Sequence, residues 1–293
     1  NHITILMGKE YNHMSKITVI AEIGINHNGS IETAKKLIDV ARIAGCDYVK
    51  FQKRNPDICV PEHQKNILRE TPWGKIKYID YKKKVEFEKQ EFDEIDEYCK
   101  KIGIKWTTSV WDLDSLKFSL NYDLDCIKIA SALITNLELL EATSKKYDEI
   151  ILSSGMSTEE EIDNAVKIAL MYSKKVVLMH CNSAYPAPLS ELNLSCIKTL
   201  KEKYKNDNVV IGYSGHETYL HTSLAAVSIG AEYIERHITL DRQMWGTDQF
   251  CSLEPQGLFR LVQATRQLEI AFGDGVIGVT PSELPARKKL RGV

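Results

Sequence analysis

The chain has 293 residues, of which 43% are hydrophobic and 27% charged, and its formal net charge at pH 7 is −2. These proportions match those of globular domains, so they exclude a disordered or fibrous chain and leave ample apolar material for a core. So small a net charge provides no overall field that would draw the protein to nucleic acid or to an anionic membrane. Any anion that the protein binds must therefore be held by local groups.

The cysteines are odd in number and show no C-x-x-C spacing, which argues against a disulfide framework. No segment approaches the roughly 18 consecutive apolar residues of a membrane-spanning helix, and the N-terminal residues lack the apolar core of a secretion signal. We therefore expect a cytoplasmic protein with no membrane segment. The cysteines are Cys46, Cys59, Cys99, Cys126, Cys181, Cys196 and Cys251.

From residue 16 onward, short β-branched runs alternate with helical segments, the pattern of βα units that feed a parallel sheet. Each predicted strand is followed by an amphipathic segment. In residues 31–44, for example, Ala34, Leu37, Ile38 and Ala41 fall on one helical face. In chain order the predicted strands span residues 17–23, 48–52, 104–108, 126–130, 150–153, 176–180, 209–212 and 233–236.

These βα units predict an α/β fold, a (β/α)8 TIM barrel that spans residues 16–293 as a single domain. A doubly wound sheet would show fewer units and a G-x-G-x-x-G turn after the first strand, which residues 24–29 do not match. Residues 1–15 are expected to form either a flexible leader or a small hairpin that covers the barrel floor.

A long polar insertion, residues 53–86, follows the second predicted strand and contains Pro56, Pro61 and Pro72. Long loops inside compact domains are more often functional than idle. We expect this insertion to lie over the mouth of the active site.

Barrel enzymes build their sites at the C-terminal ends of the strands, and these ends are polar in this sequence. Lys50 and Lys128 lie at the ends of the second and fourth predicted strands, among hydroxyl and amide side chains of their neighbours. Two fixed positive charges with neutral donors suit a phosphate or carboxylate ligand. The alternative is that both lysines end their strands in solvent.

His216 and His237 lie just past the seventh and eighth predicted strands, which are neighbours in a barrel. Two imidazoles supplemented by oxygen ligands suit a divalent ion such as Mn, Fe, Co or Zn. Two histidines that make ordinary hydrogen bonds are an equally good interpretation of this spacing. We expect His180, at an apolar strand end, to pack or hydrogen bond rather than to bind the metal.

Glu22 and Asp248 are the carboxylates that we place at the reacting centre. Either side chain can transfer protons, and Asp248 can also hold a substrate hydroxyl. Trp245, close to Asp248 in the chain, is a candidate for lining the substrate pocket.

The sequence also resembles the sialic acid synthase family, whose members condense phosphoenolpyruvate with an N-acylated hexosamine. The resemblance implies the same reaction here, with N-acetylmannosamine or a modified relative as the acceptor. The matching stretches follow one order along nearly the whole chain. They are residues 20–29, 49–52, 128–131, 153–156, 180–186, 211–217, 235–241, 246–248 and 252–255.

The resemblance implies roles by position. His216 and His237 match the family's ligands for a divalent metal, Mn2+, which polarises the open-chain aldehyde. Glu22, Tyr185 and Asp248 fall where the sugar is held, and Ser183 replaces an amide found in some members. The positions that match the phosphoenolpyruvate site are Lys50, Gln52, Thr108, Lys128, Ser131, Ser153, Ser183 and Ser214.

Two departures from the family pattern concern the sugar. Many members have a carboxylate at the position of Leu133, and typical members carry a C-terminal antifreeze-like domain whose arginine reaches the partner subunit's sugar pocket. This sequence ends at Val293 without such a domain. We expect the insertion at residues 53–86 to serve as the lid instead, and the protein to form a homodimer or a higher homo-oligomer.

Two alternatives remain open. Arg69, Lys75 and Lys77 surround a Trp-Gly pair that resembles a segment of the animal enzymes acting on a 6-phosphorylated sugar, so they could hold a second phosphate; an ordinary solvated charge run is the competing interpretation. If they hold a phosphate, alanine at Lys75 and Lys77 raises the KM for the phosphorylated sugar selectively. The second alternative is a non-catalytic barrel that binds a sugar phosphate or a metal.

Overall fold

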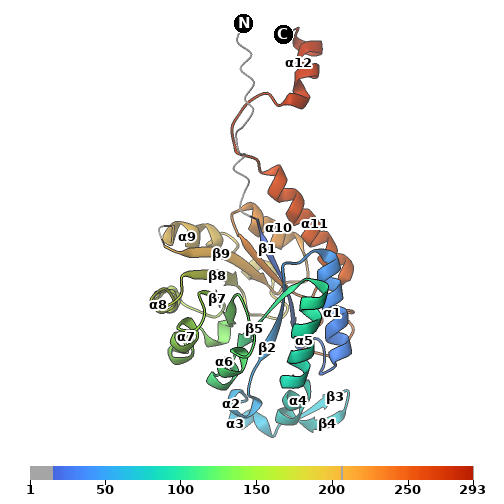
Figure 1. Cartoon of the computed structure of the whole chain (residues 1–293), viewed down its shortest axis with the longest axis vertical. Helices are drawn as coiled ribbons and strands as arrows, with labels where there is room; N and C mark the ends of the chain where they lie inside the picture. The colour runs from blue at the N-terminus through green and yellow to red at the C-terminus, as the bar shows by residue number, and fades with distance from the viewer. Residues whose placement is uncertain (1–15, 206, 293) are drawn as a thin grey trace.

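The computed structural model describes residues 16–205 and 207–292, and its eight long-range strands close into a parallel barrel (Figure 1). Around the barrel the order is β1-β10-β9-β8-β7-β6-β5-β2. All eight predicted strands are confirmed to within a few residues at each end, and so is the α/β barrel. The strands are β1 (Thr18–Gly24), β2 (Tyr48–Lys53), β5 (Lys105–Val110), β6 (Ile127–Ile129), β7 (Glu149–Ser153), β8 (Lys175–Cys181), β9 (Val209–Gly215) and β10 (Tyr233–His237).

A helix follows each barrel strand, and these helices surround the barrel (Figure 1). The first begins at Ser30, whose side chain accepts a hydrogen bond from the Thr33 backbone N–H, and ends at Gly45, which has a φ of 87°. Its predicted apolar face is buried. The helices are α1 (Ile31–Ala44), α5 (Lys89–Ile102), α6 (Leu113–Ser119), α7 (Leu137–Ser144), α8 (Glu159–Leu170), α9 (Cys196–Lys203), α10 (His221–Ser228) and α11 (Pro255–Ala271).

The barrel interior changes from apolar to charged along the strands. Near the N-terminal ends, a small cluster of buried residues fills the barrel: Ile20, Cys126, Ile151, Val177, Met179 and Tyr233. Two residues farther along β1, β6 and β10 come Glu22, Lys128 and Glu235, all buried. Because side chains alternate between the two faces of a strand, these charged groups also face the interior. The apolar cluster thus forms a floor beneath a charged layer.

The insertion at residues 53–86 contains α2 (Pro56–Cys59), α3 (Glu62–Lys65), the antiparallel pair β3 (Leu68–Thr71) and β4 (Gly74–Lys77), and α4 (Tyr78–Val85). The rings of Trp73 and Tyr81 contact Trp245, in the loop after β10, with centroid distances of 6.3 Å and 5.0 Å. The insertion therefore flanks the C-terminal rim of the barrel, whereas the sequence had suggested that it covers the mouth.

Beyond α11 the chain leaves the barrel at the end opposite the insertion and carries the short elements η3 (Pro281–Glu283) and α12 (Leu284–Arg291) (Figure 1). Side chains from residue 270 to 292 are exposed. The expected leader or hairpin at residues 1–15 lies outside the described residues. No helix within residues 16–205 and 207–292 has the length and apolar character needed to cross a membrane.

Asp47 joins three segments at the floor of the barrel. Its carboxylate accepts hydrogen bonds from the Val19 backbone N–H at 2.9 Å and from Arg266 Nη2 at 2.6 Å, and it pairs with Lys16. Burial alone would raise the pKa of Asp47, but hydrogen bonds from Lys16, Val19 and Arg266 lower it below its ordinary value.

We predict that Asp47→Asn lowers the free energy of unfolding at pH 7 by about 2 kcal/mol, because hydrogen bonds to a charged group typically contribute this much. A carboxyl with a depressed folded-state pKa stabilises fully above its unfolded pKa of about 4, and this contribution is lost as the pH falls through the folded value. In urea denaturation, the difference between variant and wild type should therefore shrink on acidification below about pH 4.

The matched control is Asp148→Asn, which removes the exposed pair between Asp148 and Lys174 at 2.6 Å. Exposed pairs contribute little, so this variant should unfold like the wild type at either pH. A destabilisation of Asp47→Asn that is independent of pH would contradict the role given to its carboxylate.

Candidate active site

A cavity of about 180 Å³ opens at the C-terminal ends of the barrel strands. Of the thirteen site residues named from the sequence, all but Thr108 and Asp248 line it. The structure therefore brings together side chains from seven of the eight strands or from the loops that follow them. Those lining the cavity are Glu22, Lys50, Gln52, Lys128, Ser131, Ser153, Ser183, Tyr185, Ser214, His216 and His237.

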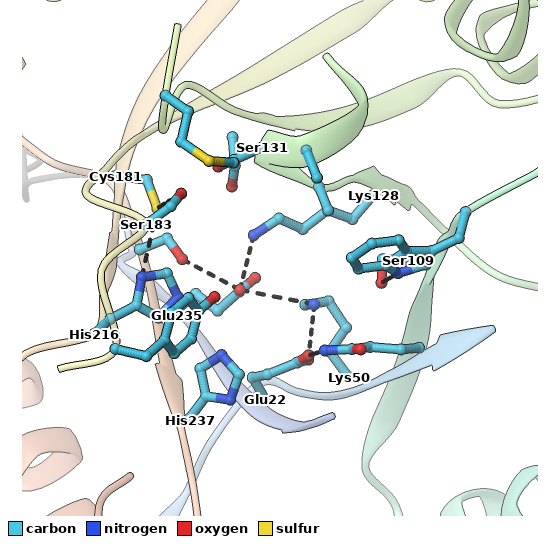
Figure 2. Close-up of a pocket in the computed structure, with 18 residues that line it drawn as sticks. Glu22, Lys50, Ser109, Lys128, Ser131, Cys181, Ser183, His216, Glu235 and His237 are labelled. Atoms are coloured by element: carbon cyan, nitrogen blue, oxygen red, sulfur yellow. Dashed lines mark hydrogen bonds and ion pairs between the residues drawn. The ribbon is translucent and has the colours of Figure 1, made fainter. Parts of the chain in front are cut away.

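A chain of buried charges crosses the cavity floor (Figure 2). Lys50 Nζ lies 2.7 Å from Glu22 Oε2 and 3.7 Å from Glu235 Oε1, and Lys128 Nζ lies 2.7 Å from the same Glu235 oxygen. All four side chains are at least 96% buried. Two ammonium groups thus face two carboxylates away from bulk water, where each unpaired charge would cost several kcal/mol.

The pKa values of these groups follow from burial and from their neighbours. Burial raises the pKa of Glu22, and the nearby Glu235 adds to this effect while Lys50 opposes it. Burial also acts against the charged form of Glu235, but Lys128 and Lys50 outweigh it and lower the pKa to about 2. For Lys128, burial dominates and lowers the pKa. Glu235 is therefore the permanently ionised carboxylate of the chain, and Glu22 is the one closer to proton exchange.

Hydroxyl groups and a tight turn line the cavity above Lys128. Ser131 Oγ accepts a hydrogen bond from the Gly155 backbone N–H at 3.1 Å, and Ser153 Oγ is buried without a partner among the described residues. A Cβ at Gly155 would overlap Ser183 Oγ and lie 2.7 Å from Ser131 Oγ, so only glycine lets the turn approach so closely. These groups offer neutral donors beside the ammonium groups, as an anionic ligand requires.

Thr108 lies beside the cavity without lining it, and its hydroxyl donates to the Ser109 carbonyl oxygen at 3.2 Å. Thr108 pairs with Phe51, a core residue, whereas Ser109 pairs with Gln52 and Lys128 and lines the cavity. The alternation of side chains along β5 thus places Ser109, rather than Thr108, at the site.

His216 and His237 face each other with ring centroids 5.2 Å apart, and the Tyr185 ring lies 4.1 Å from that of His216. His216 Nδ1 lies 2.7 Å from the Asn182 carbonyl oxygen. A carbonyl can only accept, so Nδ1 carries the proton and leaves Nε2 with a lone pair. His237 Nδ1 is buried with no hydrogen-bond partner among the described residues.

Burial lowers the pKa of His237 to about 4, so its imidazole is neutral at physiological pH. Two neutral imidazoles with free nitrogens fit a divalent ion of intermediate hardness. Within the described part of the chain, no cluster of three or more His, Cys, Asp and Glu side chains has metal-binding geometry. An ion held by these two histidines would therefore complete its coordination with water or with substrate oxygens.

Asp248 lies at the edge of the site. Its Oδ2 is 3.7 Å from His237 Nδ1, and its Oδ1 accepts a hydrogen bond from Thr247 Oγ1 at 2.6 Å. His180 lies outside the cavity, as expected, with Nε2 2.7 Å from the Leu192 carbonyl oxygen. Leu133 packs against the hydrophobic core while Ala132 lines the cavity, so this wall presents carbon instead of a carboxylate.

Sequence reasoning assigned no role to several residues that prove important. Glu235 has the same alternation as Tyr233 and His237 on β10, and this pattern could have placed it in the interior. Arg236 points to the other face of the strand, where it pairs with the buried Glu217 at 3.1 Å. Only the folded chain reveals that this ion pair supports the loop that carries His216.

The comparisons with known proteins agree with this geometry. At 38% identity, the chain is similar to the N,N'-diacetyllegionaminic acid synthase of Campylobacter jejuni, over 92% of this chain and 81% of that protein. It is 36% identical to the N-acetylneuraminate-9-phosphate synthase of Drosophila melanogaster, over 95% of this chain and 73% of that one.

Among solved structures, the N-acetylneuraminic acid synthetase of Leptospira borgpetersenii, in complex with citrate, superposes with a TM-score of 0.82. It is 34% identical, and the match covers 94% of this chain and 93% of that one. A DAHP synthase of Thermotoga maritima, at 17% identity and a TM-score of 0.67, shares the fold. A model of the NeuB family matches residues 37–277. The resemblance to sialic acid synthases is thus confirmed, and the chain belongs to the NeuB family.

Proposed function

We propose that the protein is a nonulosonic acid synthase that condenses phosphoenolpyruvate with the open-chain form of an N-acylhexosamine such as N-acetylmannosamine. The observation that carries the proposal is one cavity with two kinds of wall. Lys50 and Lys128 supply fixed positive charge on one side, and His216 and His237 present free ring nitrogens on the other. Such a cavity suits one anionic substrate and one that is polarised at an oxygen.

On the anionic side, the ammonium groups of Lys50 and Lys128 would hold the phosphate and carboxylate of phosphoenolpyruvate. The hydroxyls around Gly155 supply further donors, and the missing Cβ of this residue leaves the space that the ligand needs. The remaining candidates for this side are Gln52, Ser109, Ser131, Ser153, Ser183 and Ser214.

On the acceptor side, Tyr185 and Asp248 flank the two histidines, and Glu22 lies between them and Lys50. In the proposed reaction, carbon 3 of phosphoenolpyruvate attacks the aldehyde carbon, and the aldehyde oxygen takes up a proton to become a hydroxyl. Water adds at carbon 2 and loses a proton, and phosphate leaves with the bridging oxygen as the 2-keto group forms. We assign the proton transfers to Glu22 and Asp248, since both carboxylates lie at the reacting centre.

His216 and His237 would hold a divalent cation, Mn2+ being the candidate. Their free ring nitrogens and the neutral state of His237 fit such an ion. When bound, the ion would supply Lewis-acid polarisation of the aldehyde. The carbonyl oxygen of Asn182 fixes the orientation of the His216 ring through Nδ1.

The experiment that tests the proposal incubates the protein with Mn2+, phosphoenolpyruvate and a panel of N-acylhexosamines. We expect release of inorganic phosphate and a product with the combined mass of the sugar and pyruvate. With 18O in the bridging position, the label should leave with the phosphate. No release with any aldehyde would instead favour a barrel that binds ligands without catalysis.

We predict that His216→Ala weakens Mn2+ binding, measured by titration calorimetry, and lowers product formation by about 100-fold, because a two-histidine site has no ligand to spare. The control is His221→Ala, which changes an exposed histidine at the start of α10 and should alter neither quantity. If His216→Ala binds Mn2+ like the wild type, the assigned metal ligands are wrong.

A second candidate acceptor carries a distal phosphate, and one observation favours it. A pocket of about 320 Å³ beside the Asp248 loop is lined by Arg69, Lys82 and Thr247, among aromatic rings. Burial lowers the pKa of Lys82 to about 8, so an anion nearby would stabilise its charged form. Lys75 and Lys77 are exposed on β4, outside this pocket.

We therefore predict that the double variant Arg69→Gln/Lys82→Gln raises the KM for a 6-phosphorylated hexosamine by about tenfold, the loss expected for charge-assisted hydrogen bonds. The KM for the free sugar should change little. The double variant Lys75→Gln/Lys77→Gln removes the same charge from the exposed hairpin and serves as the control. Equal effects of both double variants on the phosphorylated sugar would exclude a phosphate pocket at Arg69 and Lys82.

A further inference from the structure

Glu235 is the centre of the buried charge chain, although neither motif reasoning nor the proposed chemistry gives it a task. It lies on β10 with 3% of its surface exposed. In Figure 2 its carboxylate lies between the two lysines, while Ser214 approaches from the other side. Every other group at the site touches fewer of the side chains that would hold the anionic substrate.

One oxygen of Glu235 makes all of these contacts. Oε1 accepts hydrogen bonds from Lys128 Nζ at 2.7 Å and from Ser214 Oγ at 3.3 Å, and it lies 3.7 Å from Lys50 Nζ. Oε2 is buried and has no hydrogen-bond partner among the described residues. A carboxylate with one oxygen unsatisfied is costly, so its position is not explained by hydrogen bonding within the fold alone.

The charges around Glu235 balance in the absence of substrate. Glu22 and Glu235 neutralise Lys50 and Lys128, and the only carboxylate within 4 Å of Lys128 among the described residues is Glu235. An anion that binds Lys128 must therefore share this ammonium group with Glu235. Because the site is buried, the repulsion between the two anions is weakly screened.

We propose that Glu235 is a positioning residue of the anion site: its carboxylate fixes the ammonium groups of Lys50 and Lys128 in the orientation that catalysis needs, at the expense of affinity for phosphoenolpyruvate. The inference rests on the proposed function for the identity of the anion. It separates the lysines' two tasks, since Glu235 opposes tight binding but maintains the geometry for reaction.

The test is Glu235→Gln, which keeps the shape of the side chain and removes its charge. Titration calorimetry with phosphoenolpyruvate, without sugar, should give a dissociation constant about tenfold lower than in the wild type, since the competing anion is gone. With sugar and Mn2+, kcat should fall by about 100-fold, because ammonium groups released from their anchor misplace the substrate. A residue needed only for folding would not increase affinity while reducing turnover.

The matched control is Glu149→Gln at the barrel floor, where Glu149 pairs with Lys175 at 2.9 Å far from the cavity. This variant should retain both values. Circular dichroism checks the fold of each protein. If Glu235→Gln does not fold, Glu235→Asp retains the charge but withdraws it from the lysines, and should shift affinity and kcat in the same directions by a smaller factor.

Weaker or unchanged phosphoenolpyruvate binding in the folded variant, or an undiminished kcat, would overturn the proposal. These outcomes differ from failure of the proposed function. In that case the wild type itself would bind no phosphoenolpyruvate or form no product.

Discussion

The site depends on the ion pairs that Glu22, Lys50, Glu235 and Lys128 form inside the barrel. Burying any one of these charges alone would destabilise the fold, but as alternating neighbours they neutralise one another. They come from four strands that are distant in sequence, so the charge chain exists only when the barrel is closed in the observed register. Its assembly therefore couples correct folding to the construction of the anion site.

The alternation of side chains along each strand connects this chain to the rest of the fold. Ile20 and Tyr233 fill the floor, and Glu22 and Glu235 rise two residues above them. The intervening side chains face the helices and pack into the main core, as Arg236 shows by pairing with Glu217 on the outer face. One strand thus serves packing, support and chemistry with successive residues.

The barrel and most of the cavity could be predicted from the sequence, because strand order and the polar strand ends together place those side chains on one rim. What could not be predicted depends on facing and on pairing. Thr108 and Ser109 are neighbours with nearly the same chemistry, and only strand register shows that Ser109 faces inward. Glu235 is an ordinary strand carboxylate until Lys50 and Lys128 are found on either side of it. The position of the insertion rests on contacts between Trp73, Tyr81 and Trp245, which no local pattern reveals.

The apolar floor of the barrel has a kinetic consequence. With Ile20, Ile151 and Met179 closing the far end, the cavity has a single entrance at the C-terminal rim. Glu235 and Lys128 lie deeper than His237, which follows Glu235 on the same strand. A ligand held by the lysines must therefore enter before one held at the histidines, and it is trapped until the outer ligand departs. A passive layer of aliphatic side chains in this way imposes a sequence of events on the two substrates.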